Sequence, residues 1–182
     1  MPLTLRDLVS TPELRLALLS EGPGVDRPVT WVHVSELRDP TPFLSGGELL
    51  LTTGLVLDVG LDPTDYVRRL SDAGVVGLGF GTGLSHTVVP AELIAAARRH
   101  GLPTLEVPRQ TPFIAISRAV SRAVAADEYA AVTKTFTAQQ ALTKAALSAA
   151  GPERLVRLLV TLHFRLLKLP CWIVTRTNFK LS

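Results

Sequence analysis

The chain has 182 residues, 47% of them hydrophobic and 19% charged, with a formal net charge of +3. This balance excludes a disordered chain and a collagen-like fibre, and the single cysteine, Cys171, excludes a disulfide scaffold. A lone cysteine and an N-terminus without a basic and apolar leader favour a cytoplasmic protein. We expect no membrane span, because the longest charge-free run, residues 73–91, contains five glycines and a proline.

The charges are distributed unevenly along the chain. Residues 1–110 contain nine arginines, no lysine and thirteen acidic residues, whereas residues 111–182 contain ten basic and three acidic residues. Nucleic-acid-binding surfaces concentrate Lys and Arg where they meet phosphate. Residues 1–110 therefore do not favour direct nucleic-acid binding. In residues 111–182, solvated helix surfaces explain the basic residues better than a nucleic-acid contact does.

The first part of the chain predicts short helices followed by strands. Residues 3–19 favour two short helices broken at Pro12, which suits a first helical turn. Residues 27–36 are rich in β-branched residues and predict a strand. A turn at residues 39–42 leads to a second strand at residues 48–53, whose continuous run of leucines is typical of a strand buried on both faces.

A helix and a short apolar strand then follow each other twice. The first helix begins at Pro63 and leads to a strand at residues 75–80; the second begins after Pro90 and leads to a strand at residues 104–107. A glycine ends each helix. This repetition is typical of parallel β-α-β crossovers. We therefore predict an α/β fold over residues 1–110, with a small, mostly parallel sheet flanked by helices.

A long C-terminal α-helical extension is predicted after this domain. Residues 112–150 contain no internal proline or glycine, and a helix of up to ~39 residues would be ~58 Å long. We interpret residues 111–150 as a linker and dimerisation helix; folding of this helix back onto its own domain is the alternative. The apolar residues with helical spacing that would form the dimer contact are Ile116, Val120, Val124, Val132 and Phe136.

Residues 151–182 predict the truncated start of a following region. Residues 155–169 form a leucine-rich helical pattern that needs a partner surface, and the chain ends soon afterwards. Residues 175–182 are polar and differ in composition from the rest, so we interpret the chain as a fragment of a longer protein or as one that carries a tail foreign to it.

The motifs of common enzymes are missing. The glycines at positions 77, 79, 81 and 83 alternate, so they do not fit the spacing of a dinucleotide-binding loop. No phosphate loop, no metal-binding pair of histidines or cysteines and no nucleophile elbow is present. We expect no enzyme activity, no cofactor and no metal.

The sequence supports a small-molecule binding site better than it supports an enzyme active site. In open α/β sheets, ligands bind beyond the carboxyl ends of parallel strands, and three predicted strands bring hydroxyls, glycine backbone, an aromatic ring and a guanidinium to that edge. A glycine turn before the second strand could form an anion cradle. The candidate residues are Thr52, Thr53, Gly79, Phe80, Gly81, Thr82 and Arg109, with Gly46, Gly47 and Glu48 in the glycine turn. The alternative is that these threonines and glycines serve only the strands and turns, and that Arg109 is a solvated surface residue.

Three segments carry a resemblance to a known family. They are VTWVHVSEL at residues 29–37, DPTPFL at residues 39–44 and GGELLLTTG at residues 46–54. These segments resemble the N-terminal domain of purine catabolism regulator (PucR) type transcription factors, and weaker similarity extends over residues 5–124. The resemblance implies a sensory domain in a bacterial regulator whose DNA binding belongs to a C-terminal helix-turn-helix outside this chain.

We therefore expect the effector-sensing and dimerising part of a transcriptional regulator. Its partners would be a small-molecule effector, purine-related or otherwise, and a second copy of the chain, with DNA contacted only through the missing domain. No residue combination here selects a purine over another planar polar molecule. A ligand-free protein–protein interaction module is the alternative.

Overall fold

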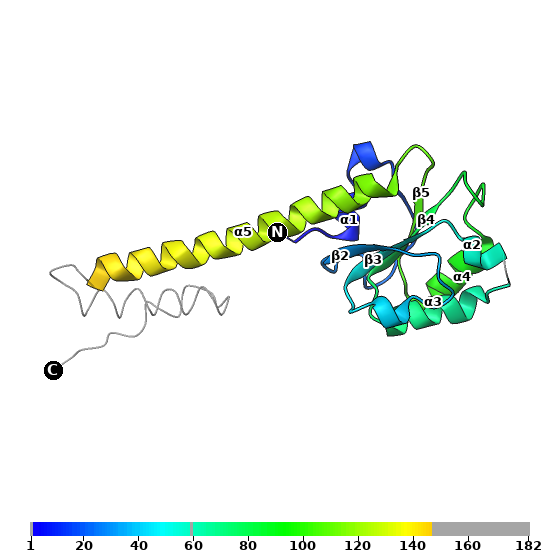
Figure 1. Cartoon of the computed structure of the whole chain (residues 1–182), viewed down its shortest axis with the longest axis horizontal. Helices are drawn as coiled ribbons and strands as arrows, with labels where there is room; N and C mark the ends of the chain where they lie inside the picture. The colour runs from blue at the N-terminus through cyan, green and yellow to red at the C-terminus, as the bar shows by residue number, and fades with distance from the viewer. Residues whose placement is uncertain (1, 59, 147–182) are drawn as a thin grey trace, which may run out of the picture. The chain divides into compact units, whose positions relative to one another are not determined.

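The computed structural model describes residues 2–58 and 60–146, which form an α/β fold around a five-stranded sheet (Figure 1). The chain divides into two units, Met1–Asp127 and Glu128–Ser182. The elements in chain order are α1 (Leu5–Val9), η1 (Pro12–Leu14), β1 (Ala17–Ser20), β2 (Trp31–Val34), η2 (Thr41–Phe43), β3 (Glu48–Thr52), α2 (Leu55–Asp58), α3 (Pro63–Asp72), β4 (Gly77–Gly81), α4 (Ala91–His100), β5 (Thr104–Val107) and α5 (Phe113–Ala146).

The sheet has the order β1-β5-β4-β3-β2. Strands β2 to β5 are mutually parallel, which the repeated helix–strand pattern predicts for β3, β4 and β5, and β1 pairs antiparallel with β5. The sheet is therefore mixed. The carboxyl ends of the four parallel strands lie at one edge of the sheet, called the carboxyl edge below, and their amino ends lie at the opposite edge.

The prediction of two short helices over residues 3–19 is wrong in its second half. The first helix forms as α1, but Pro12 begins only a 3₁₀ turn, and the chain then continues as strand β1. Arg15 ends the turn with a φ of +49°, a left-handed conformation that interrupts helical continuation. Tertiary pairing then determines the outcome, because Ala17 and Leu18 find backbone partners in Glu106 and Leu105 of β5.

Helices cover both faces of the sheet. Helices α3 and α4 pack against one face, around Leu50, Leu78 and Phe80. On the other face, α1, η1 and the first turns of α5 pack around sheet residues that include Leu49 and Leu51. Figure 1 shows these two layers. The alternation of Leu49, Leu50 and Leu51 between the two cores explains why the whole leucine run is buried.

Three alternating glycines of β4 allow the second layer to pack closely. A Cβ atom added at Gly77 would lie 2.5 Å from Leu5 of α1, and one added at Gly81 would lie 2.9 Å from the ring of Phe113 of α5. A Cβ at Gly79 would lie 2.4 Å from Leu51. These distances are shorter than van der Waals contact, so Gly77 and Gly81 allow α1 and α5 to approach the sheet, and Gly79 makes room for Leu51 of the neighbouring strand.

The first turns of α5 belong to the domain core. Ile116 and Val120 are 0% and 1% exposed, and Val124 packs against the same cluster. The predicted dimer contact through Ile116 and Val120 is thus replaced by an intramolecular one, because these side chains cover apolar surface of their own sheet. Phe136 is 59% exposed, and the side chain of Val132 lies outside what the structure describes.

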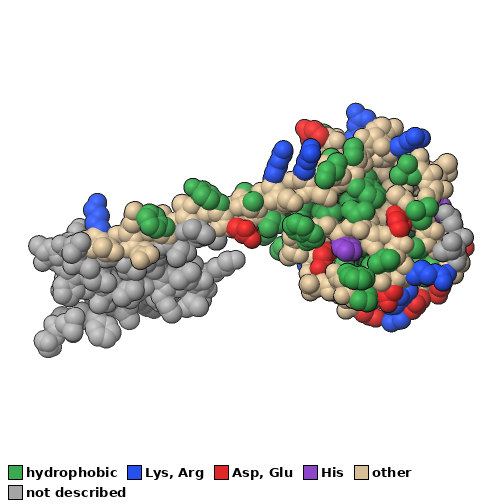
Figure 2. Space-filling view, in the orientation of Figure 1, with side chains coloured by type: hydrophobic (Ala, Val, Ile, Leu, Met, Phe, Trp, Pro, Cys, Tyr) green, Lys and Arg blue, Asp and Glu red, His purple; other side chains and the backbone are tan. Residues whose placement is uncertain are grey.

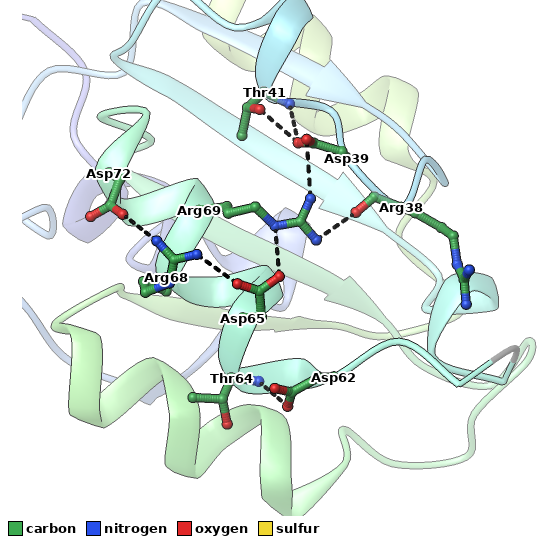
Figure 3. A network of polar contacts seen from close by, with 9 residues as sticks. All are labelled: Arg38, Asp39, Thr41, Asp62, Thr64, Asp65, Arg68, Arg69 and Asp72. Atoms are coloured by element: carbon green, nitrogen blue, oxygen red, sulfur yellow. Dashed lines mark hydrogen bonds and ion pairs between the residues drawn. The ribbon is translucent and has the colours of Figure 1, made fainter.

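Arg69 of α3 binds the segment that follows β2 through ion pairs and a hydrogen bond (Figure 3). Its guanidinium lies 3.1 Å from Asp39 and 3.1 Å from Asp65, and it donates a hydrogen bond of 3.0 Å to the carbonyl oxygen of Arg38. Hydrogen bonds from Thr41, together with the charge of Arg69, hold the pKa of the Asp39 carboxyl below its usual value. The connection between β2 and β3 is therefore tied to α3.

The region after Ala146 lies outside the described residues, and so do the predicted helix at residues 155–169 and the polar tail. Within residues 2–58 and 60–146, none of the helices combines the length and hydropathy that a membrane span requires.

The placement of α5 in the core predicts different effects for two isoleucines in one turn. Ile116→Ala is expected to lower the free energy of unfolding by about 2–5 kcal/mol, because it removes a buried side chain. Ile114→Ala, at a position that is 58% exposed, is the matched control and is expected to change it by less than about 0.5 kcal/mol. Urea unfolding followed by circular dichroism measures both, and equal effects would contradict the packing described for α5.

Candidate functional site

A pocket of about 270 Å³ lies at the carboxyl edge of the sheet. It is formed by residues that follow β3, β4 and β5, together with the start of α5. Its lining residues are Thr53, Gly81, Thr82, Leu84, Val107, Pro108, Arg109, Thr111, Pro112 and Phe113. The strand ends that the sequence brings to one edge thus surround a common cavity.

The end of β3 is held by the carboxylate of Glu36, a residue that follows β2. This carboxylate accepts hydrogen bonds of 2.8 Å from the hydroxyls of both Thr52 and Thr53. It also accepts from the backbone N–H of Thr53 and, at 3.2 Å, from that of Leu55 at the start of α2. Four donors therefore fix this carboxylate, and through it they fix the position of Thr53 in the pocket wall.

The end of β4 is joined to β5 through Thr82. Its backbone N–H donates to the carbonyl oxygen of Val107 at 2.9 Å, and its hydroxyl donates to the carboxylate of Glu106 at 2.9 Å. The next residue, Gly83, has a φ of +79°, and a Cβ atom there would lie 3.0 Å from the Cβ of Arg109. The turn after β4 therefore supports the aliphatic stem of Arg109.

The connection from β5 to α5 closes the pocket. The hydroxyl of Thr111, a buried residue, donates to the carbonyl oxygen of Leu14 at 2.8 Å. Two residues later, the ring of Phe113 lies against Gly81 of β4. The first residue of α5 is therefore both a wall of the pocket and a contact of the sheet.

The structure brings together four of the predicted site residues, namely Thr53, Gly81, Thr82 and Arg109. The other three that the sequence assigns to this edge lie behind the pocket wall. Thr52 is buried and bonded to Glu36, and Gly79 is within the strand. Phe80 is fully buried on the α3 and α4 face, where its ring centroid lies 5.5 Å from that of His86.

The predicted glycine turn lies at the opposite edge of the sheet. Gly46, Gly47 and Glu48 come at the amino end of β3, so they do not join the pocket residues. The carboxylate of Glu48 accepts hydrogen bonds from the backbone N–H groups of Ser45, at 2.7 Å, and Gly46, at 2.9 Å. The turn thus forms an anion cradle, and the carboxylate of the same chain fills it.

Some residues of the site were not singled out in the sequence. Glu36 follows a strand that runs parallel to the other three, so the strand-end argument applied to that strand identifies it. Phe113 lies just beyond the last strand, where the sequence indicates a boundary. Leu84 follows the alternating glycines and carries no sequence signal for a pocket.

The lining has the composition of a small-molecule site. It offers apolar surface, three hydroxyl groups and one guanidinium, and such a mixture of apolar walls with a few placed polar groups is typical of ligand pockets. Among the described residues, no three His, Cys, Asp or Glu side chains are grouped so that they could hold a metal ion.

The contact between Gly81 and Phe113 predicts an energetic coupling between sheet and helix. Gly81→Ala is expected to lower the free energy of unfolding by about 1–3 kcal/mol, because the added methyl group overlaps the ring. In a Phe113→Ala background the same substitution is expected to cost much less, since the overlapping ring is gone. A double-mutant cycle measured by urea unfolding gives the coupling, and additive effects would show that the two residues do not touch.

Comparison with known proteins gives a match over most of the domain. The sequence pattern of the Purine catabolism regulatory protein-like family (PucR) matches residues 7–124. The transcriptional activator PmfR of Paenarthrobacter nicotinovorans is 38% identical over 133 residues, which cover 72% of this chain and 28% of that protein. The purine catabolism regulatory protein of Bacillus subtilis is 31% identical over 104 residues, 56% of this chain and 20% of that protein. The matched segments thus span about a quarter of these relatives.

A solved structure is also similar, with a TM-score of 0.44 and 16% identity. It is that of the CBS and DRTGG domains in the regulatory region of Clostridium perfringens pyrophosphatase. The similarity covers 66% of this chain and 46% of that one.

Proposed function

This chain belongs to the Purine catabolism regulatory protein-like (PucR) family of transcriptional regulators, and we propose that it is the effector-sensing and dimerising part of such a regulator. The observation that carries the proposal is the pocket at the carboxyl edge, which includes the first residue of the long helix α5 in its wall. The proposed role is binding, without catalysis, in the cytoplasm.

Sensing requires that a bound molecule favour one conformation over another. A ligand shifts an equilibrium only by its differential affinity for the two states. A molecule in this pocket would contact Arg109, Thr111 and Phe113, which connect β5 to α5. Since Phe113 also rests on Gly81 of β4, the ligand can stabilise one position of the start of α5 relative to the sheet.

Dimerisation is assigned to the part of α5 that begins at Glu128. Tyr129 and Phe136 are 75% and 59% exposed and are seven residues apart, a spacing that places them on one helix face. Val132 occupies the intervening position of the same sequence pattern. Figure 2 shows hydrophobic side chains on the surface of α5. A second copy of the chain would bury this stripe.

DNA binding is assigned to another part of the full-length regulator. The relatives that share this domain are named as a transcriptional activator and a regulatory protein, and the chain spans about a quarter of their length. The excess of acidic over basic residues in residues 1–110 is consistent with a domain that does not itself contact phosphates. In this proposal the effector acts through α5 on a C-terminal helix-turn-helix.

Effector binding is tested by a thermal-shift screen of purines, allantoin-like compounds and amino acids. A compound present at a hundredfold its Kd should stabilise the folded state by ~2.7 kcal/mol. Leu84→Trp, which introduces a large side chain at the pocket wall, is expected to abolish the shift, whereas Leu37→Trp, at an exposed position away from the pocket lining, is not. If no compound in a broad panel shifts the melting temperature, the sensing proposal is contradicted.

Dimerisation is tested by placing a charge in the exposed stripe of α5. Phe136→Glu is expected to convert the dimer to a monomer in light scattering, because a carboxylate in an apolar helix–helix contact is strongly unfavourable. Thr137→Glu adds the same charge one position along the helix and is expected to leave the dimer intact. A chain that is monomeric without any substitution would refute this assignment.

A further inference from the structure

The threonine hydroxyl groups that line the pocket already donate hydrogen bonds within the chain. Each of its three threonines gives its hydroxyl hydrogen to an acceptor of the same chain, at distances of 2.8–2.9 Å. The acceptors are the carboxylate of Glu36 for Thr53, the carboxylate of Glu106 for Thr82 and the carbonyl oxygen of Leu14 for Thr111. A hydroxyl that has donated its hydrogen retains lone pairs. Toward a ligand, these three groups therefore act as hydrogen-bond acceptors.

Arg109 differs from the three threonines in its hydrogen bonding. It is the one ionisable residue in the pocket lining, and it makes no hydrogen bond or ion pair with any other residue that the structure describes. Its stem packs on Gly83, where an added Cβ would lie 3.0 Å from Cβ and 3.4 Å from Cδ of Arg109. The guanidinium thus remains available to a ligand as a planar group of five N–H donors, while its stem is supported.

The remaining surface is apolar and includes one aromatic ring. The ring of Phe113 and the rings of Pro108 and Pro112 contribute to the wall. Such surface favours a compact, planar body over a long flexible chain, because a rigid body loses less conformational freedom on binding.

From this division of donors and acceptors we infer that the pocket binds a small organic carboxylate that carries N–H donors at its other end. The carboxylate pairs with Arg109, and the N–H groups face the threonine hydroxyls, behind which the carboxylates of Glu36 and Glu106 favour positive partial charge. The inference rests on the proposed function, since it specifies the chemistry of the same site.

Three planar probes of equal shape test the carboxylate and the N–H donors separately. 4-Carbamoylbenzoate has the carboxylate and the N–H donors, terephthalamide replaces the carboxylate by a neutral amide, and 4-acetylbenzoate replaces the amide NH₂ by methyl. Binding is followed by ¹⁵N–¹H NMR on the full chain. We expect 4-carbamoylbenzoate to shift the amide signals of Gly81, Thr82 and Arg109 and to bind at least about tenfold tighter than either analogue.

Two pairs of variants test the role of Arg109. Arg109→Gln is expected to remove the preference for 4-carbamoylbenzoate over terephthalamide, whereas Arg99→Gln, which removes the same charge from an exposed position on α4, is expected to preserve it. Gly83→Ala is expected to weaken binding of 4-carbamoylbenzoate by displacing the Arg109 stem. Gly60→Ala controls for backbone strain, because Gly60 also has a φ of +79° but no atom within 4 Å of an added Cβ.

The outcomes separate this inference from the sensing proposal. Equal binding of the carboxylate and the diamide, unchanged binding by Arg109→Gln, or no binding of 4-carbamoylbenzoate in the millimolar range overturns the assigned ligand class. A neutral metabolite that binds in the pocket and stabilises the protein would leave sensing intact while overturning the carboxylate. Carboxylate binding that depends on Arg109, with no metabolite of the broader panel giving a thermal shift, would support the ligand class and contradict sensing.

Discussion

Close packing against β4 is the constraint on which the other features of the domain depend. Gly77, Gly79 and Gly81 present no side chains to the face that α1 and α5 cover, so Leu5 and Phe113 approach the backbone of the central strand. A side chain at Gly77 or Gly81 would displace Leu5 or Phe113, and one at Gly79 would displace Leu51 of the neighbouring strand. Because Phe113 begins α5, the same requirement determines where the long helix starts and how it meets the strand ends.

The site results from placing polar groups where parallel strands end. The carboxylate of Glu36 accepts from backbone N–H groups after β3. The end of β4 is joined to β5 by a backbone hydrogen bond from Thr82 to Val107 and by the bond from the Thr82 hydroxyl to Glu106. These internal bonds use the hydroxyl hydrogens of the threonines that line the cavity, next to Arg109 and apolar side chains. The polarity of the pocket is therefore a consequence of how the hydrogen-bonding groups at this edge of the sheet are paired.

Much of this arrangement could be predicted from the sequence, because local signals and tertiary structure agree in the repeated helix–strand units. The proline at the start of α3, the glycine after α4 and the leucine run of β3 each indicate the observed element. The common edge of Thr53, Thr82 and Arg109 follows from the parallel pairing alone. Those residues could therefore be assigned to one site from the sequence.

Other features depend on contacts that a sequence pattern does not encode. Strand β1 exists because β5 offers it an antiparallel edge, and its apolar residues fit a helix equally well when read alone. Ile116 and Val120 form a stripe that suits either a second copy or the chain's own sheet, and the structure packs it against the sheet with Leu49 and Leu51. The glycine turn at Gly46 carries the signal of an anion site, yet Glu48 two residues later occupies it.

The two sides of the cavity are held by different groups. On the Glu36 side, four hydrogen bonds join the chain after β2 to the chain after β3, so this side yields only if the sheet itself opens. On the other side, Leu84 and Val88 expose most of their surface, and His86 holds this segment to the sheet through its ring contact with Phe80 and its Nε2 atom, 3.2 Å from the carbonyl oxygen of Gly54. Widening the cavity on the Leu84 side therefore requires breaking the contacts of His86, whereas widening it on the Glu36 side requires separating two strand ends.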